Sequence, residues 1–205
     1  MKILRIENLF PTPIMLDNLL RNFSEQELNY LKNLKIIENI NNRRSAENYI
    51  LDVPEMSDLK KSIQTTVNLY FKEIHKPSDD VEIYLTQSWL NVSTVGEQHH
   101  SHYHPNSFIS GTLYISADKE LDAITFSRTD SLPLRIIPTE YNHYNSPTWY
   151  YNVGIGDLIL FPSTLHHYVT PVKESKHRQE RISISFNTFL KGTLGSEYLL
   201  SELKL

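Results

Sequence analysis

The region from residue 81 to 190 is a succession of short segments rich in β-branched and aromatic residues, several of which alternate polar and apolar side chains. Turn-forming residues such as SPT, GIGD and FPS separate these segments. Many short strands of this kind predict a β barrel or a β sandwich. The segments are VEIYLTQSWLNVSTV, SFISGTLYIS, AITFS, TWYYNV, DLILF, HHYVT and RISISFNTF.

The first third of the chain carries helical patterns instead. Ser24 and Glu27 form a capping-box pair ahead of LNYLKNL, which predicts a helix over about 25–35. A second helix is predicted over about 56–74, where one apolar stripe recurs at three- or four-residue spacing: Leu59, Ile63, Val67, Phe71 and Ile74. The predicted class is therefore α+β, mainly β, with N-terminal helices packed on a β core.

The length of 205 residues favours one domain over 1–205. Within it we expect a helical N-terminal part over 1–80, a β core over 81–190 and a C-terminal tail over 191–205. A short helix is expected in that tail, near 194–203. An exposed strand edge is compatible with a homodimer, although no residue pattern requires one.

Composition supports few special classes of function. The net charge is -4 with both signs scattered, so nothing indicates a nucleic-acid or membrane partner. Without cysteine, a metal must bind through His, Asp, Glu or backbone oxygen, and six glycines argue against a glycine-rich phosphate loop. The N-terminus is a poor signal peptide and no apolar run reaches about 18 residues, so we expect a cytoplasmic protein, in the host cytoplasm if a phage encodes it.

Histidines are concentrated in the stretch HHSHYH, which begins at His99. His102 and His104 are two residues apart, so on a strand their side chains share one face and can share one ion. The adjacent pair His166 and His167 follows a later strand, and at most one of them can join the same site. We expect a metal site here, and we expect His99 and His100 to lie in a solvated loop.

An arginine begins the segment RISISF. Arg181 and Ser183 share a face at the same two-residue spacing. A buried arginine inside a barrel needs an anion, and its planar fork matches a carboxylate, to which a neighbouring hydroxyl adds a hydrogen bond. The alternative is an exposed arginine at a strand start.

Three motifs together resemble the iron(II)- and 2-oxoglutarate-dependent oxygenases: HYHPNS…SGTLY at 102–114, FPSTLHH at 161–167 and RISISFN at 181–187. More narrowly, they resemble a group of 2OG-Fe(II) oxygenases common in phage and bacterial genomes, and SWLNVSTVG at 88–96 is similar to the lead-in strand of that group. The resemblance covers about 81–190. It implies a double-stranded β-helix, also called a jelly roll, with iron(II) and 2-oxoglutarate as cofactors.

The resemblance also implies roles for single residues. His102 is the first metal ligand and His167 the distal one, while Arg181 and Ser183 grip the far carboxylate of 2-oxoglutarate. Further expected contacts in the cosubstrate pocket are Tyr114, Asn91 and Asn187. The expected reaction is hydroxylation of a C–H bond in an unidentified substrate, which is a protein, a nucleotide or a small molecule. The stretch 129–150 forms either a wall or lid for that substrate or an ordinary surface excursion.

One position departs from the usual pattern of two histidines and one carboxylate. His104 stands where the Asp or Glu is expected, as it does in the narrower group. Three neutral imidazoles leave the ferrous site one unit more positive, which raises the iron potential and favours an anionic cosubstrate. The alternative is that His104 is not a ligand and that water or an acid such as Glu97 completes the shell.

Cupins offer a rival interpretation of the same residues. Their first motif needs a glycine six residues before the first histidine, which Gly96 supplies, and their second is partly met by Gly156, Pro162 and His167. The glutamate of the first motif is absent, and Thr164 replaces a glycine of the second. Because cupins share the β-helix, the discriminating feature is the pair Arg181 and Ser183, which a three-histidine cupin does not need.

Overall fold

The computed structural model describes residues 5–128, 134 and 136–205, and in these it contains two α helices, two short 3-10 helices and three antiparallel sheets. The helices are α1 (Glu25–Lys32), α2 (Ser57–His75), η1 (Ile50–Asp52) and η2 (Pro54–Met56). The strands are β1 (Met15–Asn18), β2 (Ile36–Asn39), β3 (Asn42–Ser45), β4 (Glu82–Ser93), β5 (His99–His102), β6 (Ile109–Ser116), β7 (Ala123–Ser127), β8 (Thr148–Asn152), β9 (Asp157–Pro162), β10 (His167–Val169), β11 (Arg181–Lys191), β12 (Thr193–Leu194) and β13 (Leu203–Lys204).

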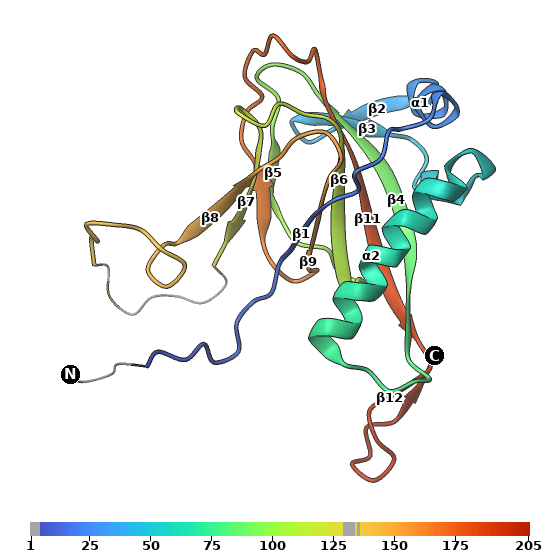
Figure 1. Ribbon diagram of the computed structural model, residues 1–205, viewed down its shortest axis with the longest axis vertical. Helices are drawn as coiled ribbons and strands as arrows, with labels where there is room; N and C mark the ends of the chain where they lie inside the picture. Colours follow the sequence, from blue (N-terminus) through green and yellow to red (C-terminus); the bar gives the residue numbers. More distant parts are fainter. Residues whose placement is uncertain (1–4, 129–133, 135) are drawn as a thin grey trace.

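The two main sheets face each other as a double-stranded β-helix (Figure 1). The larger sheet has the order β1-β9-β6-β11-β4-β3-β2, and the smaller has the order β5-β10-β7-β8. From β4 to β11 the chain passes back and forth between these sheets, which is the winding of a jelly roll. The predicted mainly β architecture with packed helices is therefore confirmed.

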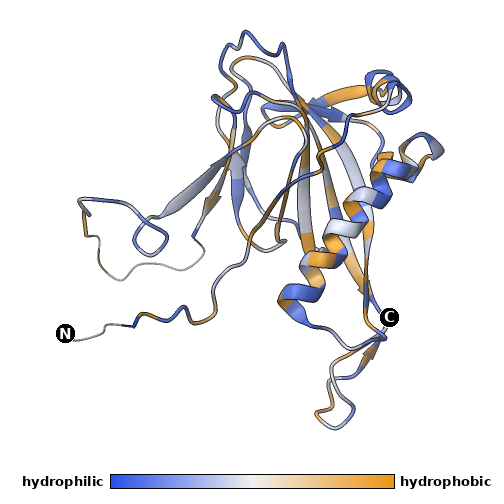
Figure 2. Cartoon of the chain, in the orientation of Figure 1, coloured by the Kyte–Doolittle hydropathy of each residue, from blue (hydrophilic) through white to orange (hydrophobic). Residues whose placement is uncertain are grey.

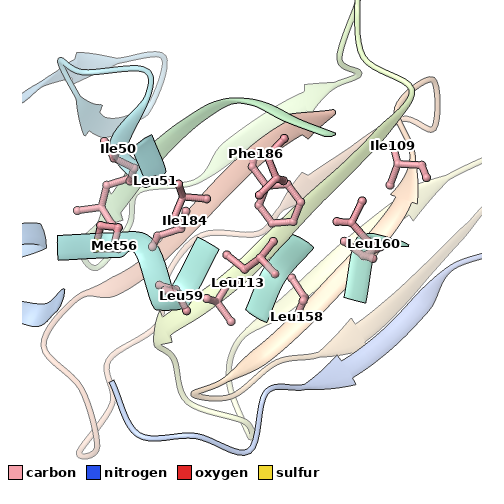
Figure 3. Packing of buried hydrophobic residues seen from close by; sticks show 14 of the residues in the cluster. Ile50, Leu51, Met56, Leu59, Ile109, Leu113, Leu158, Leu160, Ile184 and Phe186 are labelled. Atoms are coloured by element: carbon pink, nitrogen blue, oxygen red, sulfur yellow. The ribbon is translucent and has the colours of Figure 1, made fainter. Parts of the chain in front are cut away.

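Helix α2 covers the outer face of the larger sheet (Figure 1). Four residues of its predicted stripe, from Leu59 to Phe71, are buried there, and the helix carries both apolar and polar stretches (Figure 2). Ile74 was predicted to join them and does not, because it lies in the last turn and is 45% exposed. Figure 3 shows the resulting core, which includes Met56, Leu59, Leu113, Leu158, Ile184 and Phe186.

Close packing in this core explains the glycine of SGTLY. A Cβ on Gly111 would lie 2.3 Å from the ring of Phe186 on the neighbouring strand. That separation is far below van der Waals contact, so only glycine fits between β6 and the side chains of β11. The glycine thus brings the strands that carry Tyr114 and Ser183 into register, and these two residues are direct partners.

Strand β11 has two chemically different faces. Ile182, Ile184 and Phe186 pack against the α2 side of the sheet. The alternate residues, Arg181, Ser183, Ser185 and Asn187, are also buried, but on the face toward the smaller sheet. Neighbouring strands repeat this division, so a polar inner face lies between the sheets.

The N-terminal part differs in detail from the prediction. Helix α1 begins as predicted, with Ser24 and Glu27 in a capping box, but ends at Lys32 rather than near 35. Strands β1, β2 and β3 extend the edges of the larger sheet, so 1–80 is not purely helical. The short polar run NRRS of β3 does not alternate, and its pairing with β2 and β4 makes it a strand.

The predicted helix over 194–203 is wrong. Strands β12 and β13 pair there as a small hairpin. Gly195 and Leu200 both have positive φ angles, of 72° and 53°, which a right-handed helix cannot accommodate.

Two further expectations concern other parts of the chain. Residues 129–133 and 135 of the stretch 129–150 lie outside the described residues, and among the described helices none is long and apolar enough to cross a membrane.

Candidate metal and cosubstrate site

Three histidines converge at the end where β5 and β10 meet. His102 ends β5, His167 begins β10, and the two residues are direct partners across the strands. His104 follows two residues later, with its backbone N–H donating to the carbonyl of Ser163 at 2.9 Å. One ligand atom from each histidine lies within 4.8 Å of the other two, and the Nε2 atoms of His104 and His167 are 3.3 Å apart.

The outer nitrogen of each ring has an oxygen acceptor. His102 Nδ1 lies 2.8 Å from the His100 carbonyl, His104 Nδ1 lies 2.7 Å from Asn187 Oδ1, and His167 Nδ1 lies 3.0 Å from the Leu165 carbonyl. Since these oxygens accept, each Nδ1 donates a proton, which leaves each Nε2 with a free lone pair. This pattern of outer contacts is the one that orients metal-binding imidazoles.

Burial keeps these rings neutral. Burial, followed by repulsion from the neighbouring His102, lowers the pKa of His167 to about 2 and that of His104 to about 4. Burial also lowers the pKa of His102. Neutral imidazoles closely grouped, without a proton to fill their lone pairs, are the donor set of an iron, zinc or nickel ion.

A narrow cavity of about 30 Å³ leads from His102 and His167 to Arg181. Of the predicted cosubstrate residues, it brings together Arg181, Ser183, Tyr114 and Asn91. It is also lined by Asn42, Ser93, His99, Thr112, Ile124, Val169 and Ser185. Such a volume holds one or two water molecules, so a larger ligand requires lining side chains to shift.

Asn187 lies outside the lining of this cavity. Its Oδ1 accepts from His104 and from the hydroxyl of Ser110, at 2.7 and 3.0 Å. It therefore orients a histidine rather than forming part of the pocket wall. Two polar lining residues were missed from the sequence: Asn42 belongs to a strand with no motif, and Ser93 lies in the lead-in stretch 88–96 without standing out there. Only the sheet brings both to the cavity.

Arg181 sits at the far end of the cavity and is 6% exposed. Its Nη1 is 3.6 Å from Asp122 Oδ1 and 3.4 Å from the carbonyl of Thr170. The Asp122 carboxylate already accepts hydrogen bonds from Nε and Nη2 of Arg178, at 2.6 and 2.7 Å. Two buried guanidinium groups thus share this carboxylate, and Asp118 places a second negative charge near Arg178. Arg181 makes the longer contact with Asp122, so it is the guanidinium group that can still bind an anion.

Two buried polar atoms that belong to lining residues of the cavity lack a hydrogen-bond partner in the described part of the chain. Among the described residues, neither the Tyr114 hydroxyl nor the Asn91 Oδ1 has a hydrogen-bond partner. Burial also raises the pKa of Tyr114, so its hydroxyl stays protonated and can donate. An arginine, a serine and a tyrosine donor around one cavity fit a carboxylate of a small organic acid.

Glu97, the acid suggested as an alternative ligand, lies outside the histidine cluster. Its carboxylate accepts from the backbone N–H of Thr94 at 2.6 Å and from its hydroxyl at 3.0 Å, and it lies 3.5 Å from Arg43 Nη2. These contacts hold the loop between β4 and β5 and leave the three-histidine set as the candidate metal centre.

A larger groove, of about 760 Å³, lies beside the site. Phe126 and Leu165 form its inner wall, and Phe126 is the strand partner of both His167 and Trp149. The N-terminal segment lines one side from Glu7 to Ile14, and the described part of the stretch 129–150 contributes His143, Tyr144, Ser146, Thr148 and Trp149.

Residues 87–187 match the family model described as "Putative 2OG-Fe(II) oxygenase". Three solved structures resemble the fold at low sequence identity. An oxidoreductase of the 2OG-Fe(II) oxygenase family from Burkholderia pseudomallei is 11% identical, with 85% of this chain and 83% of that chain covered and a TM-score of 0.57. The alpha ketoglutarate dependent epimerase SnoN from nogalamycin biosynthesis is 10% identical, with 88% and 81% covered and a TM-score of 0.60.

The third structure is HygX from Streptomyces hygroscopicus, solved with nickel and 2-oxoglutarate bound. It is 13% identical, with 86% of this chain and 82% of that chain covered and a TM-score of 0.54. At these identities the likeness concerns the fold. No curated protein matches the chain.

Proposed function

We propose that this chain hydroxylates a C–H bond of its substrate. Its residues 87–187 match the family of 2OG-Fe(II) oxygenases, enzymes that depend on iron(II) and 2-oxoglutarate. The observation that carries the proposal is a cluster of three histidine ligand atoms, beside a cavity that His102 and His167 line together with the buried Arg181. When bound, the metal and the keto acid would direct the oxidising power of dioxygen to the substrate C–H bond. One oxygen atom would leave in succinate, formed with loss of carbon dioxide, and the other would enter the substrate as hydroxyl.

In this proposal His102, His104 and His167 hold the iron. Asn187 and two backbone carbonyls fix the ring orientations, as their contacts with the Nδ1 atoms support. Because all three ligands are neutral, the ion keeps its full double charge until an anion arrives. The protein thereby favours a dianionic cosubstrate over neutral competitors.

The remaining residues of the cavity would hold 2-oxoglutarate. Arg181 and Ser183 would bind its far carboxylate, and the Tyr114 hydroxyl would donate to the same group. Asn91 presents an acceptor to the cavity, while its Nδ2 donates to Ser185 at 2.9 Å. Side chains such as His99 must move for the ligand to enter, since the cavity measures about 30 Å³.

We also propose that the groove beside the site receives the substrate. Trp149 and His143, whose rings are 4.3 Å apart, give it an aromatic wall, in support of the view that the stretch 129–150 is a substrate wall. The substrate class stays open between protein, nucleotide and small molecule. A cytoplasmic location and a homodimer likewise remain proposals from the sequence.

The test is anaerobic. Iron(II) and then 2-oxoglutarate are added to metal-free protein, and the visible metal-to-ligand charge-transfer band of the keto acid on iron is recorded. We expect the band in the wild type and its loss in Arg181→Ala, with iron binding retained. Arg21→Ala is a matched control, because Arg21 is a partly buried arginine that pairs with Glu27 away from the cavity.

Two outcomes would overturn parts of the proposal. If wild-type protein binds iron(II) but gives no band and no heat of 2-oxoglutarate binding, the three histidines serve a cupin-like metalloenzyme instead. If the band forms but product analysis shows a substrate isomerised without added oxygen, the hydroxylase assignment fails while the cofactor assignment stands.

A further inference from the structure

Asn42 is a buried amide that the described structure leaves without partners. It is 2% exposed, and neither its Nδ2 nor its Oδ1 has a hydrogen-bond partner among the described residues. It begins β3, in the hairpin ahead of the β core, and it lines the cavity that contains Arg181. No sequence motif includes it.

The pairing of strands places Asn42 at the arginine end of that cavity. Arg44 pairs with Asn91 and Arg43 with Val92, so the next position of β4 along the ladder, Ser93, lies beside Asn42. Ser93 is in turn the partner of Arg181 on β11. Asn42, Ser93 and Arg181 thus form one row, and two strand spacings give about 10 Å between the outer backbones.

The hairpin that carries Asn42 is fixed in place. The backbone N–H of Gln98 donates to the carbonyl of Asn41 at 2.9 Å, which ties the β2–β3 turn to the segment before β5. On β3, Ser45 donates to the carbonyl of Glu47 and accepts from the backbone N–H of Leu90, at 2.7 and 3.0 Å. The unpaired amide of Asn42 therefore belongs to a hairpin that hydrogen bonds hold in place.

Leaving such a group unpaired is costly. A buried amide without hydrogen bonds costs about 1–3 kcal/mol, and native structures keep few of them. Two explanations remain for its place in the cavity: an ordered water or the organic anion that Arg181 attracts. The charge of the surroundings favours the anion, because an amide N–H aimed at a carboxylate makes a strong, charge-assisted hydrogen bond.

We propose that Asn42 donates a hydrogen bond to the carboxylate of 2-oxoglutarate that Arg181 holds. The N-terminal hairpin is then part of the cosubstrate pocket, and Asn42 selects for a five-carbon dicarboxylate over shorter keto acids. This inference rests on the proposed function. It adds a binding residue from outside residues 87–187, the region that matches the family.

The experiment compares two substitutions of Asn42 by anaerobic calorimetry at pH 8 on iron(II)-loaded protein. Asn42→Ala removes the donor and should weaken 2-oxoglutarate binding about tenfold, the equivalent of one hydrogen bond to a charged group. Asn42→Asp keeps the shape but adds a negative charge beside the bound carboxylate, so it should weaken binding more than Asn42→Ala does. Iron(II) affinity, measured separately, should not change.

A shorter ligand makes the test specific. 2-Oxobutyrate lacks the distal carboxylate, so its weaker affinity should be the same in wild type and Asn42→Ala. Ser45→Ala is the matched control, since Ser45 is a buried polar residue of the same strand that does not line the cavity. It should leave the affinity for 2-oxoglutarate unchanged even if it lowers the melting temperature.

The outcomes separate the inference from the proposed function. If wild type binds 2-oxoglutarate and both Asn42 variants bind it within twofold of wild type, a water fills the site and the inference is wrong. Equal losses in the two variants, or an equal loss for 2-oxobutyrate, would indicate a packing role and also overturn it. A wild type that binds no 2-oxoglutarate contradicts the proposed function instead.

Discussion

His99 was expected in a solvated loop, and the structure contradicts this. Its ring stacks on that of His102 with centroids 4.4 Å apart, and it lines the cavity. Residues three apart on a regular strand point to opposite faces. Here the register shifts, because His102 pairs with His167 while His99 pairs with Val169, so three steps on β5 match two on β10. This bulge turns both rings to one side.

The buried histidines should make the metal-free protein sensitive to mild acid. The pKa values of His104 and His167 lie at about 4 and about 2 in the folded state, below the ordinary histidine pKa of about 6.5, because burial disfavours their charged forms. Below pH 6.5 the unfolded chain therefore binds more protons than the folded one, and stability falls as the pH falls. We expect a loss of about 1.4 kcal/mol per pH unit for each of these histidines between pH 6 and 5.

Urea unfolding of metal-free protein from pH 7.5 to 5 measures this slope. The double variant His104→Asn, His167→Asn should have a clearly shallower slope over the same range. Carboxylates with lowered pKa values, such as Asp157, lose their contribution only below about pH 4, so they do not confuse the comparison. A stability that stays constant from pH 7 to 5 in the wild type would refute the expectation.

Among the elements, β11 best links sequence to site. The alternation in RISISFN predicted that Arg181 and Ser183 share a face, and they do line one cavity. The same alternation continues to Ser185, which lines the cavity, and to Asn187, which orients His104. The inward face of a jelly roll is usually apolar, so a run of buried polar residues there is itself a sign of a ligand pocket.

The contrast between two isoleucines of α2 yields a prediction at this scale. Ile63→Ala should lower the free energy of unfolding by about 2–5 kcal/mol, because Ile63 is fully buried between the helix and the larger sheet. Ile74→Ala removes the same atoms from an exposed position of the same helix and should change it by less than about 0.5 kcal/mol. Urea denaturation of both variants at pH 7 provides the comparison, and equal effects would mean that α2 does not pack as described.

For the molecule as a whole, the metal site joins parts that the chain keeps apart. His102 and His167 belong to the smaller sheet, whereas His104 lies in a segment tied to the larger one through Ser163, which follows β9. A bound ion would therefore link the two sheets. Because the three ligand atoms converge only when the sheets are folded, the ion should bind the folded state more tightly and stabilise the entire fold.

Iron(II), or nickel(II) as an oxygen-stable substitute, should raise the melting temperature and a chelator should reverse the rise. At a free metal concentration of one hundred times Kd, the expected stabilisation is about 2.7 kcal/mol. His104→Ala should lose most of this shift if His104 is a ligand, whereas the control His177→Ala, which alters a histidine outside the three-histidine cluster, should keep it. A full shift in His104→Ala would mean that two histidines and solvent hold the metal.

The sequence by itself determined the features that depend on near neighbours. Period-2 and period-3.6 patterns specified most strands and both helices, and the capping box marked the start of α1, because these signals arise within a few residues. The spacing of His102 and His104, and of Arg181 and Ser183, predicted shared faces for the same reason. Only the tertiary structure decided what converges across strands. Strand register brings Asn42 to the site, and a bulge brings His99. The ion pair between Arg178 and Asp122 joins residues 56 positions apart in the chain. These arrangements depend on contacts between residues far apart in the chain, and the residues next to them in the sequence do not indicate such contacts.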